Sequence, residues 1–168
     1  MSLCIGIDPG LSGAIAIIDH AGELVSVTDS PIVRDLSLAW VDGGELQSIV
    51  LNALQGRPAR AFVERVSSMP GQGVASSFQF GVGFGSILSV LQAMQISLIF
   101  VTPAVWKRSY GLGKDKHASL HKARLLWPSA DLRLAKHDGR AEALLIAEYG
   151  RRRLAGVSVA TLNMGDAA

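Results

Sequence analysis

Four acidic residues stand where the sequence predicts strand ends or the start of a helix. Asp8 and Glu64 each end a short apolar run, whereas Asp138 and Glu142 are four residues apart in a stretch with helical spacing. That spacing puts both carboxylates on one helix face, where a cation between them would relieve their repulsion. Carboxylate oxygens suit Mg²⁺ or Mn²⁺. Two such ions about 3.5–4 Å apart can activate water against a phosphodiester, so four converging acids would predict a nuclease.

Small residues follow Asp8 at once, in the order Pro9, Gly10, Ser12 and Gly13 with Leu11 between. A phosphate can come close to metal ions only where the backbone carries no bulky side chain, and Ser12 could touch a phosphate oxygen. Simpler explanations stay open: Asp before Pro-Gly is a common turn former, and Asp138 could be a helix cap.

The elements that must position these acids follow from hydrophobic periodicity. Three short strands open the chain, a helix and a strand follow, and then another helix, a strand and two helices. Because a strand–helix–strand unit implies parallel neighbours, we expect an α/β fold whose five-stranded mixed sheet joins an antiparallel three-strand meander to two parallel strands, with helices on its faces. Asp8 and Glu64 would then meet at one sheet edge. The expected strands are 3–7, 14–18, 24–27, 59–64 and 96–102, and the expected helices are 43–55, 74–95, 116–126 and 138–154.

Length and composition limit the class of protein. The 168 residues fit one domain over 1–155, with a tail over 156–168 that we expect to be poorly ordered. Cys4 is the single cysteine, which excludes an internal disulfide and an all-cysteine metal site. Gly, Asp or Gln interrupts each apolar stretch, so we expect none to reach the ~18 residues of a membrane span. These features predict a cytoplasmic protein without a membrane partner.

Charge is unevenly distributed along the chain. Residues 1–102 carry a net charge of −4 and residues 103–153 a net charge of +7, although the whole chain has only +2. A polyanion would meet the basic half, but a solvated helix surface explains such a pattern equally well.

Three segments together resemble the acidic motifs of RuvC-type Holliday junction resolvases, which have a ribonuclease H-like fold. They are "IGIDPGLSGA", "FVE" after a helix, and "HDGRAEALLIA". The segment "VTPAVWKRSYGLGKDKHASLHKARLLWP" adds the family's pattern of a Pro, lysines, a Gly-containing loop and a Lys that opens a helix. The resemblance covers roughly residues 3 to 150.

The resemblance implies a structure-selective endodeoxyribonuclease that works as a homodimer on four-way DNA and makes paired symmetric nicks. Two Mg²⁺ ions per active site, replaceable by Mn²⁺, would cut each strand to a 5′-phosphate and a 3′-hydroxyl. Asp8, Glu64, Asp138 and Glu142 would bind the metals, and Lys116 would offset charge at the scissile phosphate. The DNA contacts implied are Ser12, Lys107, Arg108, Lys114, Lys116 and Met69, with Lys107 and Arg108 on phosphates farther along.

Two departures from the family pattern leave residue roles open. The last two acidic positions are usually three apart and end in Asp, whereas Glu142 follows Asp138 by four, so His137 could also ligate metal. After Glu64 the family often presents an aromatic wedge, for which Met69 or Phe78 would have to substitute. The helix over 74–95 is either core or a dimer face, and its glycines favour a dimer. The tryptophans are interpreted as packing residues.

Other functions remain open alternatives. A related ribonuclease H-fold nuclease on other branched DNA or RNA–DNA hybrids would use the same acids. A catalytically inactive junction-binding module is the other alternative, but it would be expected to have lost at least one of the four acids, and all four are present. An actin-like or sugar-kinase ATPase shares a Gly-Ile-Asp phosphate loop but needs a far longer chain. The preferred cutting sequence and the helper proteins cannot be read from the sequence.

Overall fold

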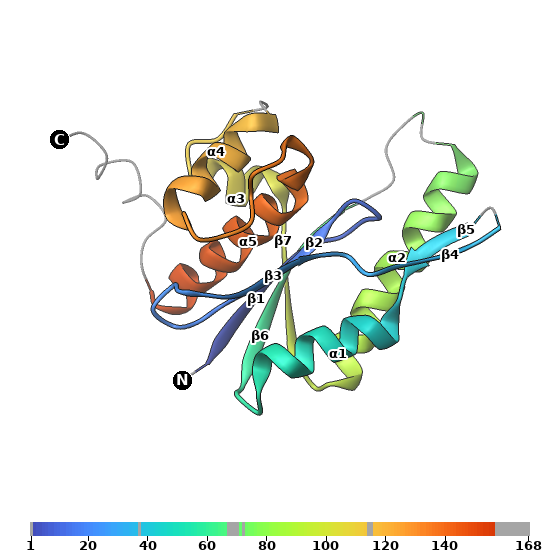
Figure 1. Ribbon diagram of the computed structural model, residues 1–168, viewed down its shortest axis with the longest axis horizontal. Coiled ribbons are helices and arrows are strands. Elements are labelled where there is room, and N and C mark those ends of the chain that lie inside the picture. Colours follow the sequence, from blue (N-terminus) through green and yellow to red (C-terminus); the bar gives the residue numbers. More distant parts are fainter. Residues whose placement is uncertain (1, 37, 67–70, 72, 114–115, 157–168) are drawn as a thin grey trace.

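A five-stranded mixed sheet is the centre of the computed structural model, which describes residues 2–36, 38–66, 71, 73–113 and 116–156 (Figure 1). Its strands are β1 (Leu3–Asp8), β2 (Ala14–Ile18), β3 (Leu24–Asp29), β6 (Ala59–Glu64) and β7 (Ser97–Val101), in the order β3-β2-β1-β6-β7. β1, β2 and β3 form an antiparallel meander, and β1, β6 and β7 run parallel. The predicted fold class is therefore confirmed.

Two groups of helices cover the two faces of the sheet (Figure 1). Helices α1 (Gly43–Leu54) and α2 (Val74–Ala93) lie on one face, and α3 (Pro103–Ser109), α4 (Lys116–Leu126) and α5 (Asp138–Leu154) lie on the other. Each face has its own apolar cluster of buried side chains. Helix α1 begins at Asp42, whose carboxylate accepts hydrogen bonds from the backbone N–H groups of Gly44 and Glu45 at 2.9 and 3.1 Å.

Strand alternation decides which way the acids point. In β1, Leu3, Ile5 and Ile7 pack toward α1 and α2, whereas Cys4 packs toward α5. Because side chains alternate along a strand, Asp8 points to the same face as Cys4, which is the face of α5. In β6, Phe62 packs with the α5 cluster, so Glu64, two residues further, points there too.

Glycines let α5 lie unusually close to the sheet. A Cβ on Gly6 of β1 would lie 2.0 Å from the carbonyl oxygen of Ala143 in α5. A Cβ on Gly139, in the first turn of α5, would lie 2.5 Å from the carbonyl oxygen of Ser12. Real Cβ atoms do not come this close, so only glycine allows the start of α5 to lie against the β1–β2 turn.

Four described elements were not predicted. β4 (Ile32–Asp35) and β5 (Leu38–Val41) form a separate hairpin, η1 (Ala135–His137) precedes α5, and α3 follows β7 directly. Pro103 was interpreted as the end of a strand, but it is also the first residue of α3, where its missing N–H is harmless. The other predicted elements are present with ends that differ by a few residues.

Helix α2 is longer and more apolar than expected of a surface helix. Within its 20 residues, an 18-residue stretch has a mean hydropathy of 1.5, and 17% of that stretch is buried. By length and composition it could cross a membrane, so the expectation that no apolar stretch is long enough is wrong for this helix. Its side chains Val74, Phe78 and Val82 are exposed.

Candidate metal centre

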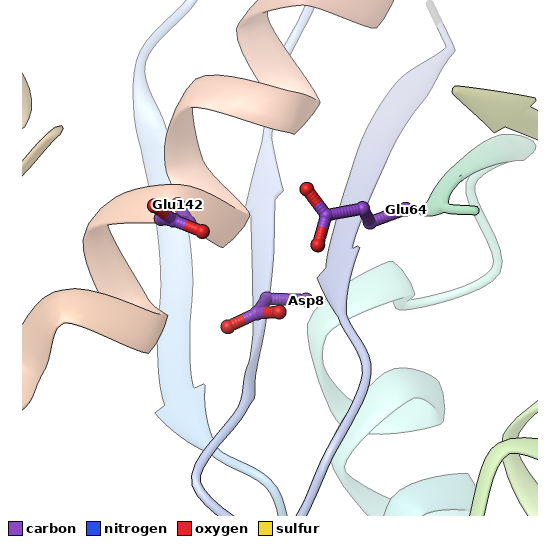
Figure 2. A group of neighbouring side chains, drawn as sticks. All are labelled: Asp8, Glu64 and Glu142. Carbon is purple, nitrogen blue, oxygen red and sulfur yellow. The ribbon is translucent and has the colours of Figure 1, made fainter. Parts of the chain in front are cut away.

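Three carboxylates meet at the edge of the sheet where β1 and β6 end. Asp8 is the last residue of β1, Glu64 is the last of β6, and Glu142 lies in α5 above them (Figure 2). One carboxylate oxygen from each of the three residues lies within 4.8 Å of the other two. The parallel register of β1 and β6, with Ile7 opposite Val63, explains why two strand ends 56 residues apart meet.

Asp138 borders the same site. A cavity of about 180 Å³ is lined by Asp8, Ser12, Lys107, Asp138, Gly139 and Glu142. Asp138 is one turn before Glu142 on α5, and its own carboxylate accepts a hydrogen bond from the backbone N–H of Gly139 at 3.0 Å. The N-cap position of α5 is His137, so Asp138 is not the helix cap that the sequence suggested. Asp138 lies in the first turn, where its negative charge is favourable to the helix dipole, and it also lines the cavity.

Burial and nearby negative charge raise the pKa values of Asp8 and Glu64. Burial holds the pKa of Asp8 well above its usual value, and the negative charges of Glu64, Glu142 and Asp138 raise it further while Lys107 lowers it. Burial also raises the pKa of Glu64, against an indole hydrogen bond that lowers it. A site with so much unbalanced negative charge favours a divalent cation, and its all-oxygen donor set fits Mg²⁺ or Mn²⁺.

Lys107 reaches into the carboxylate group. Its ammonium nitrogen lies 2.8 Å from Oε1 of Glu142, and Ser119 Oγ donates a hydrogen bond to the same oxygen at 3.1 Å. Lys107 was expected on phosphates farther along, but the unpredicted helix α3 carries it into the site. The expected contact of Lys107 with phosphates farther along stays a prediction.

Trp106 is a site residue that sequence reasoning missed. It was interpreted as a packing residue, and its side chain is indeed fully buried. However, its indole Nε1 donates a hydrogen bond to Oε1 of Glu64 at 2.8 Å. The signal available in the sequence was its position next to Lys107, together with the rule that a buried indole N–H requires an acceptor.

The remaining predicted site residues do not all lie at the carboxylate cavity. Ser12 lines the carboxylate cavity, and its contact with a phosphate oxygen stays a prediction. Arg108 is exposed and borders a separate groove of about 670 Å³ between α3 and the Gly111–Gly113 turn, which Lys107 also lines. Lys116 begins α4, but its side chain is outside the described part of the structure. Lys114 and Met69 also lie outside the described residues.

His137 lies next to the site but is not one of the three clustered residues. It is buried, and its Nδ1 has no hydrogen-bond partner among the described residues. Within that same part of the chain, the group able to hold a metal consists of Asp8, Glu64 and Glu142. A metal-ligating role for His137 therefore stays a prediction.

Comparisons with known proteins agree with this architecture. No family model matches the chain. A 92-residue stretch, 52% of the chain, is 37% identical to the chloroplastic Holliday junction resolvase MOC1 of Chlamydomonas reinhardtii, but it spans only 10% of that protein. The structure resembles RuvC of T. thermophilus in complex with a Holliday junction substrate, with a TM-score of 0.59 and 15% identity over 94% of this chain and 98% of that one.

A second solved structure, Thermus thermophilus RuvC, gives a TM-score of 0.58 at 16% identity, over 92% of this chain and 97% of that one. The chain thus has the ribonuclease H-like fold found in RuvC. The resemblance to RuvC-type Holliday junction resolvases that the sequence motifs indicate is confirmed.

Proposed function

We propose that this protein is a divalent-metal-dependent endodeoxyribonuclease that resolves four-way DNA junctions by paired, symmetric nicks. The observation that carries the proposal is the convergence of Asp8, Glu64 and Glu142 within 4.8 Å, beside Asp138. Acids that only end strands or cap helices have no reason to gather at such an electrostatic cost. A cation resolves that cost, and the resulting site suits phosphodiester hydrolysis.

The chain's own residues would do most of the positioning. Asp8, Glu64, Asp138 and Glu142 would hold two Mg²⁺ ions, for which Mn²⁺ could substitute. Bound there, the ions would supply an acidified water and withdraw charge from the scissile phosphate. The hydrolysis would leave a 5′-phosphate and a 3′-hydroxyl.

Neighbouring groups would hold the phosphate and screen its charge. The ammonium of Lys107, already in the cavity, is placed to balance negative charge that develops on a phosphate oxygen. Ser12 borders the cavity where the small residues of the β1–β2 turn leave room for a DNA backbone. The roles of Lys114, Lys116, Arg108 and Met69 in DNA binding are part of the same proposal.

The proposed four-way DNA substrate is supported by similarity to known proteins and by the charge of the chain. The relative with local sequence identity is named as a Holliday junction resolvase, and the similar solved structure is a complex with a Holliday junction. The net charge of +7 over residues 103–153 suits a polyanion. A homodimer would present one site to each of two strands, and the exposed apolar side chains of α2 are suited to its interface.

Location and domain limits remain predictions. We expect a cytoplasmic protein with one domain over 1–155, and the chloroplast location belongs to the relative's name alone. Of the predicted tail over 156–168, residues 157–168 lie outside the described residues.

A cleavage panel tests the proposal. Purified protein is mixed with a synthetic four-way junction, a linear duplex of the same sequence and an RNA–DNA hybrid, each with Mg²⁺ or with EDTA. Symmetric nicks in the junction only, and only with Mg²⁺, are expected. Preferred cleavage of the hybrid would favour the related nuclease instead, and tight junction binding without any cleavage would favour an inactive binding module.

A further inference from the structure

Helix α3 delivers two adjacent side chains to two different carboxylates. Trp106 donates its indole N–H to Glu64 at 2.8 Å, and Lys107 pairs with Glu142 at 2.8 Å. Neighbouring residues on a helix point about 100° apart, so one short helix can reach both acids. The ammonium of Lys107 also lies 5.0 Å from the centre of the Trp106 ring, which holds the two side chains together.

We propose that Trp106 is a positioning residue of the metal centre, which fixes the Glu64 carboxylate in the orientation that binds metal. This inference rests on the proposed nuclease function and adds a specific residue to it. Trp106 acts through Glu64 and touches neither the ions nor the DNA.

The chemistry of the two groups explains why an indole suits this place. The indole N–H can only donate, so it engages an ionised carboxylate through one lone pair and leaves the others available to a cation. Glu64 has three rotatable bonds and is repelled by the acids beside it, so without an anchor its carboxylate can turn away from Asp8. Because the Trp106 ring is fully buried, the anchor itself is rigid.

A second tryptophan provides the matched control. Trp127 is also buried, and its indole also donates one hydrogen bond, to the backbone carbonyl of Gly22 at 2.9 Å. That acceptor lies in the β2–β3 turn and is not a carboxylate of the site. Trp106→Phe and Trp127→Phe therefore each lose one indole hydrogen bond and similar ring volume, but only the first change affects a proposed metal ligand.

Calorimetric titration of the DNA-free proteins with Mn²⁺ and Mg²⁺ measures the effect without relying on catalysis. Groups that hydrogen-bond to metal ligands typically contribute 10- to 100-fold in metal affinity, so Trp106→Phe should bind metal at least ~10-fold more weakly, while Trp127→Phe should bind like wild type. Junction cleavage at limiting metal should fall in parallel, and saturating metal should restore much of it. Equal affinities in the two variants, measured under conditions where both are folded, would overturn the inference.

A second measurement uses the unmodified protein, so it does not depend on how the variants fold. The three tryptophans give three indole N–H signals in a ¹⁵N-labelled sample, and the two Phe variants assign them. Adding Mg²⁺ should move the Trp106 signal and leave the Trp127 signal in place. If the Trp106 signal stays in place while metal binds, the inference is overturned. If the wild-type protein binds no metal at all, the proposed function itself is contradicted.

Discussion

Replacing Asp8 by Asn should make the metal-free protein more stable while it abolishes cleavage. The substitution keeps the shape of the side chain and removes a negative charge from a group of acids whose oxygens lie within 4.8 Å. At that separation and an effective dielectric constant of about 20, one pair of carboxylates repels by roughly 3.5 kcal/mol. The Lys107 ammonium offsets part of this, so we expect Asp8→Asn to raise the free energy of unfolding in EDTA at pH 7 by about 1–3 kcal/mol.

The pH dependence of stability provides a second test of the expected sign of the Asp8→Asn effect. Because the pKa of Asp8 is higher in the folded protein than its ordinary value of 3.8, the folded state holds that proton more tightly than the unfolded state. Stability from this group is therefore present below the ordinary pKa and is lost as the pH rises through the raised value. The advantage of Asp8→Asn over wild type should be absent in acid and grow toward neutral pH.

Urea denaturation in EDTA and in Mg²⁺ measures both effects. Ligand at about 100 times its Kd stabilises a protein by about 2.7 kcal/mol, so saturating Mg²⁺ should stabilise wild type by about that much and Asp8→Asn by far less. Asp42→Asn is the control, because Asn caps α1 as well as Asp does and Asp42 is not one of the clustered acids. An Asp8→Asn protein that is less stable than wild type in EDTA, or equally stabilised by Mg²⁺, would refute the electrostatic reasoning.

Three further outcomes are expected. Lys107→Met removes the cation from Glu142, so calorimetry should show tighter Mg²⁺ binding while single-turnover cleavage at saturating metal drops at least ~10-fold. Gly139→Ala introduces a Cβ 2.5 Å from a carbonyl oxygen of the β1–β2 turn and should cost about 1–3 kcal/mol in urea unfolding, whereas Gly44→Ala, whose Cβ meets one side-chain oxygen at 3.4 Å, should be nearly neutral. Phe78→Glu places a charge on the exposed face of α2; if the proposed homodimer uses this face, light scattering should report a dimer for wild type and a monomer for the variant.

The carboxylate site could be predicted because its geometry follows from local rules. Strand alternation and parallel pairing bring Asp8 and Glu64 to one edge and one face, and helical spacing puts Asp138 and Glu142 together. The sequence could place all four near one another without knowing any contact. The docking of α5 through its glycines decides which three of the four carboxylates lie closest together. It also decides that Asp138 lies outside that group of three. No local sequence pattern contains this information.

The contribution of α3 could not be predicted for a related reason. A seven-residue helix has too few residues to show an apolar periodicity, and Pro103 allowed both a strand end and a helix start. Without α3, the sequence did not indicate where the Trp106 side chain points or which residue Lys107 contacts. The hairpin of β4 and β5 was missed similarly, because its turn uses Leu36 at a positive φ of 47° and no glycine or asparagine marks it.

The order in which the acids occur along the chain would couple the proposed cutting activity to completed folding. Asp8 and Glu64 lie in β1 and β6, but Glu142 arrives with α5, the last helix described, whose docking onto β1 and β6 also buries the core on that face. A chain still emerging from the ribosome, or one clipped by a protease ahead of α5, would lack both a complete ligand set and a closed interior. Unfinished or damaged copies of this protein would therefore lack the proposed metal site.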